Sequence, residues 1–184
     1  MANKFEKVSF EQFCKDIRTQ LHIKDTVTTL VEDTFRVMYN VVKKPVRETI
    51  DSAGYDIVVP YTVTIPAHGG VIIPSGLKCQ IESGMYLMLL PRSSVGIKNN
   101  CILANTVGVI DKDYYNNQDN EGHILMALYN YGIHDIKFEA GKAVVQGIFS
   151  KYYKTEDDFV TKRRSGGIGS TDNGNKTDKA LFKF

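Results

Sequence analysis

Residues 91–114 read PRSSVGIKNNCILANTVGVIDKDY, and this stretch contains the parts of a site for phosphate chemistry. Arg92 offers a planar fork of donors for phosphate oxygens, and Ser93 and Ser94 add hydroxyl groups. Asp111 follows two apolar residues, so we expect it at the end of a strand, where its carboxylate can act as a base. Taken alone, the stretch also fits an ordinary turn, a strand and a surface turn.

The composition narrows the class of protein. A length of 184 residues fits one domain, and 42% apolar residues is ordinary for a globular chain. A net charge of +2 is too small to indicate nucleic-acid binding. Since no stretch approaches the roughly 18 apolar residues of a membrane helix, we predict neither a membrane nor a nucleic-acid partner.

Cysteine and histidine usage gives no sign of a metal or disulfide framework. The three cysteines are odd in number and far apart, and the four histidines are dispersed. We expect each histidine at the surface or in a turn rather than on a metal. The first residues lack the apolar core of a secretory signal, so the predicted location is cytoplasmic.

The first forty residues differ from the rest of the chain. Ser9 and Gln12 form a capping-box pattern, and apolar residues at helical spacing predict a helix over about residues 10–21. Asp25 is the predicted cap of a second helix. Alternating apolar residues over 35–41 predict that the chain has entered a strand there.

Further along the chain, short apolar runs separated by turn residues predict an all-β barrel or sandwich. The expected strands cover residues 57–59, 61–65, 71–73, 77–81, 85–90, 102–104, 107–110, 124–129 and 144–149. The predicted division is a helical extension over 1–34, a β-barrel over 35–160 and a flexible, glycine-rich arm over 161–184.

Five short blocks carry polar chemistry in a fixed order. They are Ala-Gly-Tyr-Asp at 53–56, Pro-Arg-Ser-Ser at 91–94, residues 105–114, the strand around Gln146, and Gly-Gly-Ile-Gly-Ser-Thr at 166–171. In this order and spacing they resemble the five motifs of trimeric dUTPases, of bacterial or phage type, in the dUTPase and dCTP deaminase superfamily. The resemblance covers about residues 35–171, with the third block the most specific.

The resemblance implies a mainly β fold, a distorted jelly-roll β-barrel of the β-clip type, here with an N-terminal helical extension. It also implies a homotrimer in which each site takes motifs from more than one subunit. The C-terminal arm would close over the site of a neighbour.

The implied reaction is hydrolysis of dUTP to dUMP and pyrophosphate. Asp111 would activate a water molecule for attack on the α-phosphorus. A Mg²⁺ cofactor would bridge the phosphate oxygens, held by substrate and water with no direct protein ligand. Such an enzyme keeps uracil out of DNA and supplies dUMP for thymidylate synthesis.

The resemblance also assigns substrate contacts. Tyr114 would pack on the deoxyribose and exclude a 2′-hydroxyl, and Asn105 would read uracil together with backbone groups near Gly108. Asp56 would support the site from the first motif. The residues implied to bind the triphosphate are Arg92, Ser93, Ser94 and Gln146.

The fifth motif departs from the family pattern. Arg163 takes the place of the arginine that meets the γ-phosphate, with Arg164 as a possible substitute. Gly167 belongs to the glycine-rich backbone, and Ile168 stands where the family has an aromatic residue over uracil. An aliphatic side chain can still cover the base, but the stacking contribution is lost.

Two other functions remain as alternatives. A dCTP deaminase resembles dUTPases in fold and in its Pro-Arg-Ser-Ser block, but Ala127 stands where its active-site glutamate is expected. A nucleotide-binding regulatory protein is the second alternative, favoured by the helical extension. A purely non-catalytic protein need keep neither Asp111 nor Tyr114.

Overall fold

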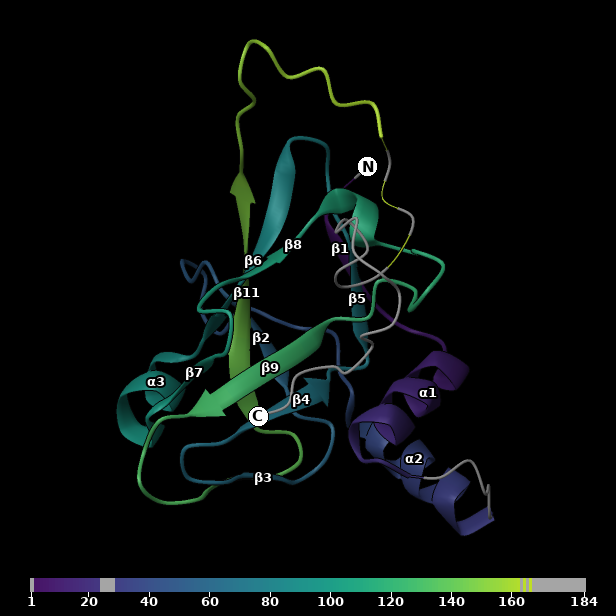
Figure 1. Cartoon of the computed structure of the whole chain (residues 1–184), viewed down its shortest axis with the longest axis vertical. Coiled ribbons are helices and arrows are strands. Elements are labelled where there is room, and N and C mark those ends of the chain that lie inside the picture. Colours follow the sequence, from purple (N-terminus) through teal and green to yellow (C-terminus); the bar gives the residue numbers. More distant parts are fainter. Residues whose placement is uncertain (1, 24–28, 163, 165, 167–184) are drawn as a thin grey trace.

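The structure is a computed structural model that describes residues 2–23, 29–162, 164 and 166. Antiparallel strands dominate its regular structure, as the sequence predicted (Figure 1). In chain order the elements are β1 (Lys4–Lys7), α1 (Phe10–Gln20), α2 (Thr29–Val41), β2 (Tyr55–Val58), β3 (Val63–Ile65), β4 (Gly70–Pro74), β5 (Leu77–Gln80), β6 (Met85–Pro91), α3 (Ser93–Asn99), β7 (Cys101–Leu103), β8 (Gly108–Ile110), a 3₁₀ turn η1 (Lys112–Tyr114), β9 (Leu125–Asn130), β10 (Ile136–Phe138) and β11 (Ala143–Lys151).

The strands form four antiparallel sheets that surround one apolar core. The largest has the order β2-β11-β6-β8, and the next has the order β4-β9-β7. Two-stranded sheets, β10-β3 and β1-β5, complete the arrangement. The predicted jelly-roll fold class is confirmed, and the largest sheet carries Asp56, Gly108 and Gln146 of the predicted site.

The two faces of the β2-β11-β6-β8 sheet differ in burial. Leu87 and Leu89 of β6 point into the core and are almost fully buried. On the alternate positions, Met88, Leu90 and Ile148 are only half-buried. This alternation is the pattern of an antiparallel sheet with one face on the core and one face turned outward.

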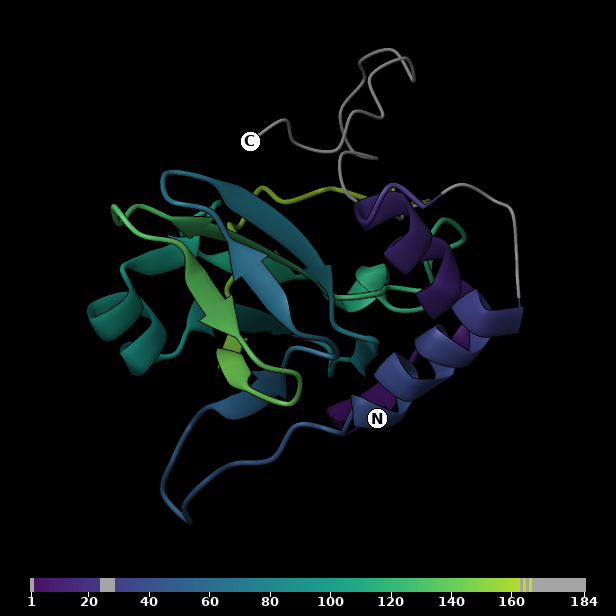
Figure 2. The same cartoon turned by 90° about the horizontal axis from the view of Figure 1, so that it is seen from below.

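The predicted first helix is confirmed as α1. The Ser9 hydroxyl accepts a hydrogen bond from the Gln12 N–H, which is one half of the capping box. Phe13 and Ile17 are fully buried, so this helix contributes to the core. Figure 2 shows α1 and α2 together on one side of the β-structure.

The prediction of a strand over residues 35–41 is wrong, because α2 runs from Thr29 to Val41 and crosses the predicted boundary at residue 34. Phe35 is buried, and Met38 packs partly against the core, whereas Val37 is 67% exposed. These positions follow a helical period of three to four residues, which a short window of alternating residues imitates. The predicted cap at Asp25 lies outside the described residues.

The sequence analysis missed β1, α3 and β10. Lys and Glu occupy three of the four positions of β1, so its pairing with β5 leaves no apolar alternation to detect. Two serines and a glycine lower the helix propensity of α3. Within the described ranges, no helix is long and apolar enough to cross a membrane.

Candidate functional site

Three of the predicted site residues meet where β6 ends. Asp56 of β2 pairs with Gln146 of β11, and Gln146 pairs with Leu90 of β6, so the side chains of Asp56 and Gln146 lie on the same outward face. Arg92 follows β6 directly, and its Nε lies 3.2 Å from Asp56 Oδ1. The strand ladder therefore brings the first, second and fourth sequence blocks together.

Gly54 makes room for the amide of Gln146. A Cβ atom at Gly54 would lie 2.2 Å from Gln146 Oε1, far inside van der Waals contact. The absence of a side chain thus lets the Gln146 side chain lie against the backbone just before β2.

The Asp56 carboxyl is held in a partly desolvated position. Its side chain is 16% exposed, and burial raises its pKa above the ordinary value, while the charge of Arg92 works in the opposite direction. The Asp56 carboxylate orients the guanidinium group, because the ion pair at 3.2 Å favours rotamers of Arg92 that keep the two charges together.

Ser93 and Ser94 begin helix α3, immediately after Arg92. The carbonyl oxygen of Arg92 accepts hydrogen bonds from the N–H groups of Val95 and Gly96. This turn places both serines at the start of α3, next to Arg92 in the chain.

Asp111 lies at the strand end where the sequence placed it, one residue after β8 and before η1. Its side chain is 53% exposed, and Arg164 Nη1 lies 3.3 Å from its Oδ2. Arg164 also donates its backbone N–H to Asp113 Oδ2 at 3.2 Å. The start of the C-terminal arm therefore meets the predicted base within the same chain.

Tyr114 is buried, with only 4% of its surface exposed. Its hydroxyl donates to the carbonyl oxygen of His123 at 3.0 Å and accepts from Asn120 Nδ2 at 2.8 Å. The guanidinium carbon of Arg164 lies 5.1 Å from the ring centroid, a cation–π distance. Burial raises the pKa of Tyr114, so its hydroxyl stays protonated as a donor.

Asn105 and Gly108 belong to the segment that leads into β8. Asn105 is exposed in the turn after β7, and the next residue, Thr106, has a positive φ of 61°. A Cβ at Gly108 would lie 3.0 Å from the Cβ of Leu89, so glycine allows β8 to lie close to β6. The exposed Asn105 side chain and the neighbouring backbone are open to a ligand.

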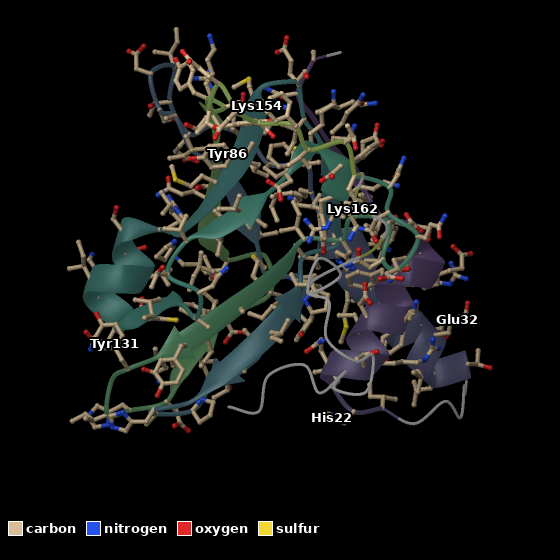
Figure 3. The ribbon with its side chains drawn as sticks, turned by 45° about the horizontal axis from the view of Figure 1, so that its top comes forward. His22, Glu32, Tyr86, Tyr131, Lys154 and Lys162 are labelled. Atoms are coloured by element: carbon tan, nitrogen blue, oxygen red, sulfur yellow. The ribbon has the colours of Figure 1, made fainter. Side chains whose placement is uncertain are left out.

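An open cleft of about 1020 Å³ lies beside Asp111. It is bounded by residues 111–113 on one side and by the segment that follows β11 on the other, which arches over this end of the sheet (Figure 1). Lys154 lies on that segment, near the end of β6 that carries Tyr86 (Figure 3). The cationic residues lining the cleft are Lys112, Lys154, Lys162 and Arg164.

The predicted site residues form two groups within one chain. The Arg92 group is Asp56, Arg92, Ser93, Ser94 and Gln146, and the second group lies around Asp111. Ile110 pairs with Leu87 near the start of β6, whereas Arg92 follows the last residue of that strand. At the rise of an antiparallel strand, Asp111 and Arg92 are separated by roughly 15–20 Å. One chain therefore does not bring the predicted base to the Arg92 group. Arg163, Gly167 and Ile168 lie outside the described residues.

Residues 112–123 are held by contacts that the sequence did not predict. His123 was expected at the surface or in a turn, but it is fully buried and its Nδ1 lies 2.5 Å from Asp16 Oδ2 of α1. Glu121 accepts hydrogen bonds from Ser9. These partners are more than one hundred residues apart, so no local pattern could have identified them.

The described residues include no group of three or more His, Cys, Asp or Glu side chains that could hold a metal ion. Any ion near Asp111 or Asp56 would need most of its ligands from substrate and water.

Comparisons with known proteins identify relatives of this chain. Residues 41–172 match the family described as dUTPase. The chain is 43% identical over 129 residues to the deoxyuridine 5′-triphosphate nucleotidohydrolase of Lactococcus lactis, covering 69% of this chain and 86% of that one. The corresponding protein of Yarrowia lipolytica is 33% identical over 136 residues, covering 70% and 82%.

Solved structures show the same fold. A dUTPase from Streptococcus mutans has a TM-score of 0.58 and 43% identity, covering 61% of this chain and 88% of that one. A point mutant of the dUTPase of phage phi11 of S. aureus, described with a structural Mg(II) ion, has a TM-score of 0.57 and 19% identity, covering 69% and 95%. At that identity the second likeness concerns the fold alone.

Proposed function

Because this chain belongs to the dUTPase family, we propose that it hydrolyses dUTP to dUMP and pyrophosphate. The observation that carries the proposal is Asp111, a half-exposed carboxylate at the end of β8, beside Tyr114 and a cleft whose lining includes four cationic residues together with Asp113 and Asp158. Hydrolysis of dUTP would keep uracil out of DNA, and the dUMP that it forms would supply thymidylate synthesis.

Asp111 acts as the general base of the reaction. Its carboxylate accepts a proton from a water molecule as the water oxygen bonds to the α-phosphorus. The bond between the α-phosphorus and the bridging oxygen breaks, and pyrophosphate leaves with the electron pair. The exposure of Asp111 gives water access to its oxygens.

The Arg92 group binds the triphosphate. Arg92, oriented by Asp56, presents its guanidinium group to phosphate oxygens, and Ser93 and Ser94 donate from the start of α3. Gln146 adds an amide donor from β11. Arg92 is positive, and the serine and glutamine side chains are neutral. These donors therefore complement the anionic triphosphate, while Asp111 of the same chain remains at a distance.

A Mg²⁺ ion bound with dUTP would take phosphate and water oxygens as ligands, the set this ion prefers, because the described residues offer no carboxylate cluster for it. When bound, such an ion neutralises charge on the phosphate oxygens. The residues of the chain then position the substrate and the water.

Specificity comes from the segment before Asp111 and from Tyr114. Asn105 and backbone groups near Gly108 read the edge of uracil, whose order of donor and acceptors differs from that of cytosine. A mismatched buried group costs about 1–3 kcal/mol. Tyr114 packs on the deoxyribose and leaves no room for a 2′-hydroxyl, with its ring placed by the bonds to His123 and Asn120.

The active form is a homotrimer with sites shared between subunits. Within one chain, Asp111 and Arg92 lie roughly 15–20 Å apart, which is too far for both to contact one bound triphosphate. The outward face of the large sheet also exposes apolar side chains at Met88, Leu90 and Val109. A second copy covering this face would bring its Asp111 to the Arg92 group. Sedimentation equilibrium is expected to give three times the chain mass of 20.7 kDa.

The C-terminal arm covers the bound nucleotide. Arg164 already contacts Asp111 and Tyr114, so the arm reaches the site from its first residues. Arg163 or Arg164 meets the γ-phosphate, and Gly167 and Ile168 cover the phosphate chain and the base. Protection of the arm from trypsin by a dUTP analogue would test this; unchanged cleavage after Arg163 or Arg164 contradicts it.

The deaminase alternative is not favoured. Ala127 lies in β9 opposite Ile72 and has no ionisable group to transfer a proton. The relatives described above are nucleotidohydrolases. A regulatory role would be an addition to hydrolysis rather than a replacement.

A pyrophosphate-release assay with dUTP, dCTP, dTTP and UTP tests the proposed function. We expect turnover of dUTP alone, and Asp111→Asn is expected to lower kcat by about 10²–10⁴-fold. An equally active Asp111→Asn variant contradicts the assignment of the base, and a wild-type protein inactive on dUTP contradicts the function itself.

A further inference from the structure

We infer that the N-terminal segment, residues 2–23, braces the loop that carries Tyr114, and that Asp16 is a positioning residue for discrimination against the 2′-hydroxyl. The inference rests on the proposed function for its substrate. The matched family segment begins at residue 41, so all of this brace precedes it.

One face of α1 is attached to residues 117–123. Ser9, Gln12 and Asp16 recur at intervals of three and four residues, so they lie on one face of the helix. Glu121 accepts from both the backbone N–H and the hydroxyl of Ser9. Gln12 Nε2 donates to Asp16 Oδ2 at 2.8 Å. Glu121 thereby supplies the second half of the capping box, which Gln12 leaves unfilled.

The Asp16–His123 pair is the buried centre of this attachment. His123 is 0% exposed, and its Nε2 accepts the N–H of Gly76 at 2.7 Å. Because Nε2 accepts, the ring proton lies on Nδ1, which donates to Asp16 Oδ2. Both ring nitrogens are therefore used for structure, and His123 has a single orientation between α1 and the turn before β5.

His123 transmits this orientation to Tyr114 through its backbone. The carbonyl oxygen of His123 accepts the Tyr114 hydroxyl, and Asn120 donates to the same hydroxyl. The Tyr114 carbonyl oxygen in turn accepts from Asn117 Nδ2 at 2.8 Å. Displacement of His123 would therefore move the ring that closes on the sugar.

Further contacts tie the loop to the same segment. Lys15 Nζ donates to the Asp119 carbonyl at 3.1 Å. The Tyr115 hydroxyl donates to Glu6 of β1 at 2.6 Å. Contacts at both β1 and α1 mean that the loop is held along its length, so loss of one contact shifts it without releasing it.

The backbone at Glu121 and Gly122 explains why the loop needs an external brace. Gly122 has a φ of +80°, and a Cβ there would lie 2.5 Å from the Tyr114 carbonyl oxygen. Glu121 also has a positive φ of 57°. Glycine adopts this conformation without steric cost, but Glu121 does not, so its bonds from Ser9 and Lys78 stabilise the left-handed backbone there.

The test combines hydrogen exchange with substrate discrimination in the full-length chain. In Asp16→Ala we expect amide exchange within residues 114–123 to rise by about tenfold or more, since a buried donor loses its partner. The ratio of kcat/KM for dUTP to that for UTP is expected to fall by a similar factor. Exchange in β6 and β11 is expected to stay unchanged.

Three further variants make the result specific. Asp16→Asn keeps an acceptor for Nδ1 of His123 and is expected to restore discrimination. Glu11→Ala, at an exposed position of the same helix, is expected to behave as wild type. Ser9→Ala removes the hydroxyl bond to Glu121 and the cap of α1 but keeps the backbone bond, and it repeats the test at a less buried site if Asp16→Ala does not fold.

A lower melting temperature in Asp16→Ala with unchanged loop exchange would overturn the inference. Faster exchange with unchanged discrimination would overturn it too, because the brace would then not position Tyr114. If the wild type does not hydrolyse dUTP, the proposed function fails separately, and the exchange measurement alone decides whether the brace exists.

Discussion

The two ends of β6 hold their site residues by different means. At the Arg92 end, neighbouring strands place Asp56 and Gln146 side by side through the backbone ladder. At the Asp111 end, Tyr114 stands on a 3₁₀ turn and a loop fixed by side chains of the N-terminal segment. A ladder resists loss of any one side chain, whereas a loop held by side chains is displaced when one of those contacts is lost.

This difference also separates two tasks. In the proposed function, the Arg92 end would bind the anionic substrate, and the Asp111 end would supply the base and the cover for the sugar. Keeping the carboxylate away from the guanidinium group in one chain prevents a direct ion pair between them. The site would then be complete only where two subunits meet, with one supplying the Arg92 end and the other the Asp111 end.

The largest expected effect comes from mixing subunits. Asp111→Asn and Arg92→Ala are each expected to be nearly inactive, but unfolding and refolding them together would recover about a quarter of wild-type activity, if each site draws its two ends from different subunits at random. The pyrophosphate-release rate of the mixture measures this. No recovery would mean that both ends of one chain form the site.

Arg92→Ala is expected to lower kcat/KM for dUTP by about 10²-fold, because one charged donor to the triphosphate is lost. Asp56 would also be left partly buried without its cation. Steady-state kinetics measure the effect. Arg47→Ala is a matched control, since the Arg47 side chain donates to the backbone carbonyls of Ile50 and Ser52 in its own exposed loop; an equal loss there would point to a general charge effect.

Gly54→Ala is expected to raise KM for dUTP by about tenfold through displacement of the Gln146 amide. A double variant with Gln146→Ala checks the cause, because without the amide the added methyl group meets only the Cβ at position 146, at 3.2 Å. If the double variant binds substrate worse than Gln146→Ala alone, the methyl group disturbs the strand rather than the side chain.

Glu121→Gln is expected to cause the smallest change, a loss of about 1 kcal/mol in unfolding free energy at neutral pH. Burial works against the charged form of Glu121, yet the bonds from Ser9 and Lys78 hold its pKa below the ordinary 4.5. Its stabilisation is therefore complete above that value and is lost as the pH falls through the lowered pKa.

Denaturant titrations across this acid range measure the pH effect. The wild type and Glu121→Gln are expected to converge in stability at the acid end. A gap that stays constant with pH would show that the charge of Glu121 does not contribute to the attachment of the loop.

Local pattern was sufficient for α1 and for most strands, because capping residues and alternation act within a few positions. It was misleading over residues 35–41, where Phe35 and Tyr39 satisfy both a strand and a helix period. It could not detect β1, whose pairing with β5 is set by backbone bonds rather than by apolar side chains.

The order of the five blocks identified the family, and the position of Asp111 after β8 followed from two apolar residues before it. The separation of Asp111 from Arg92 did not follow, because register between β6 and β8 depends on pairing across the sheet. The Asp16–His123 pair was equally hidden, since burial of a histidine is decided by packing of α1 against residues far along the chain.

The sequence alone therefore determined which chemical groups the protein has and in what order the chain presents them. Only the tertiary structure decided which of those groups meet, because contacts between distant segments are fixed by strand register and by side-chain packing, neither of which is written in any short stretch of residues.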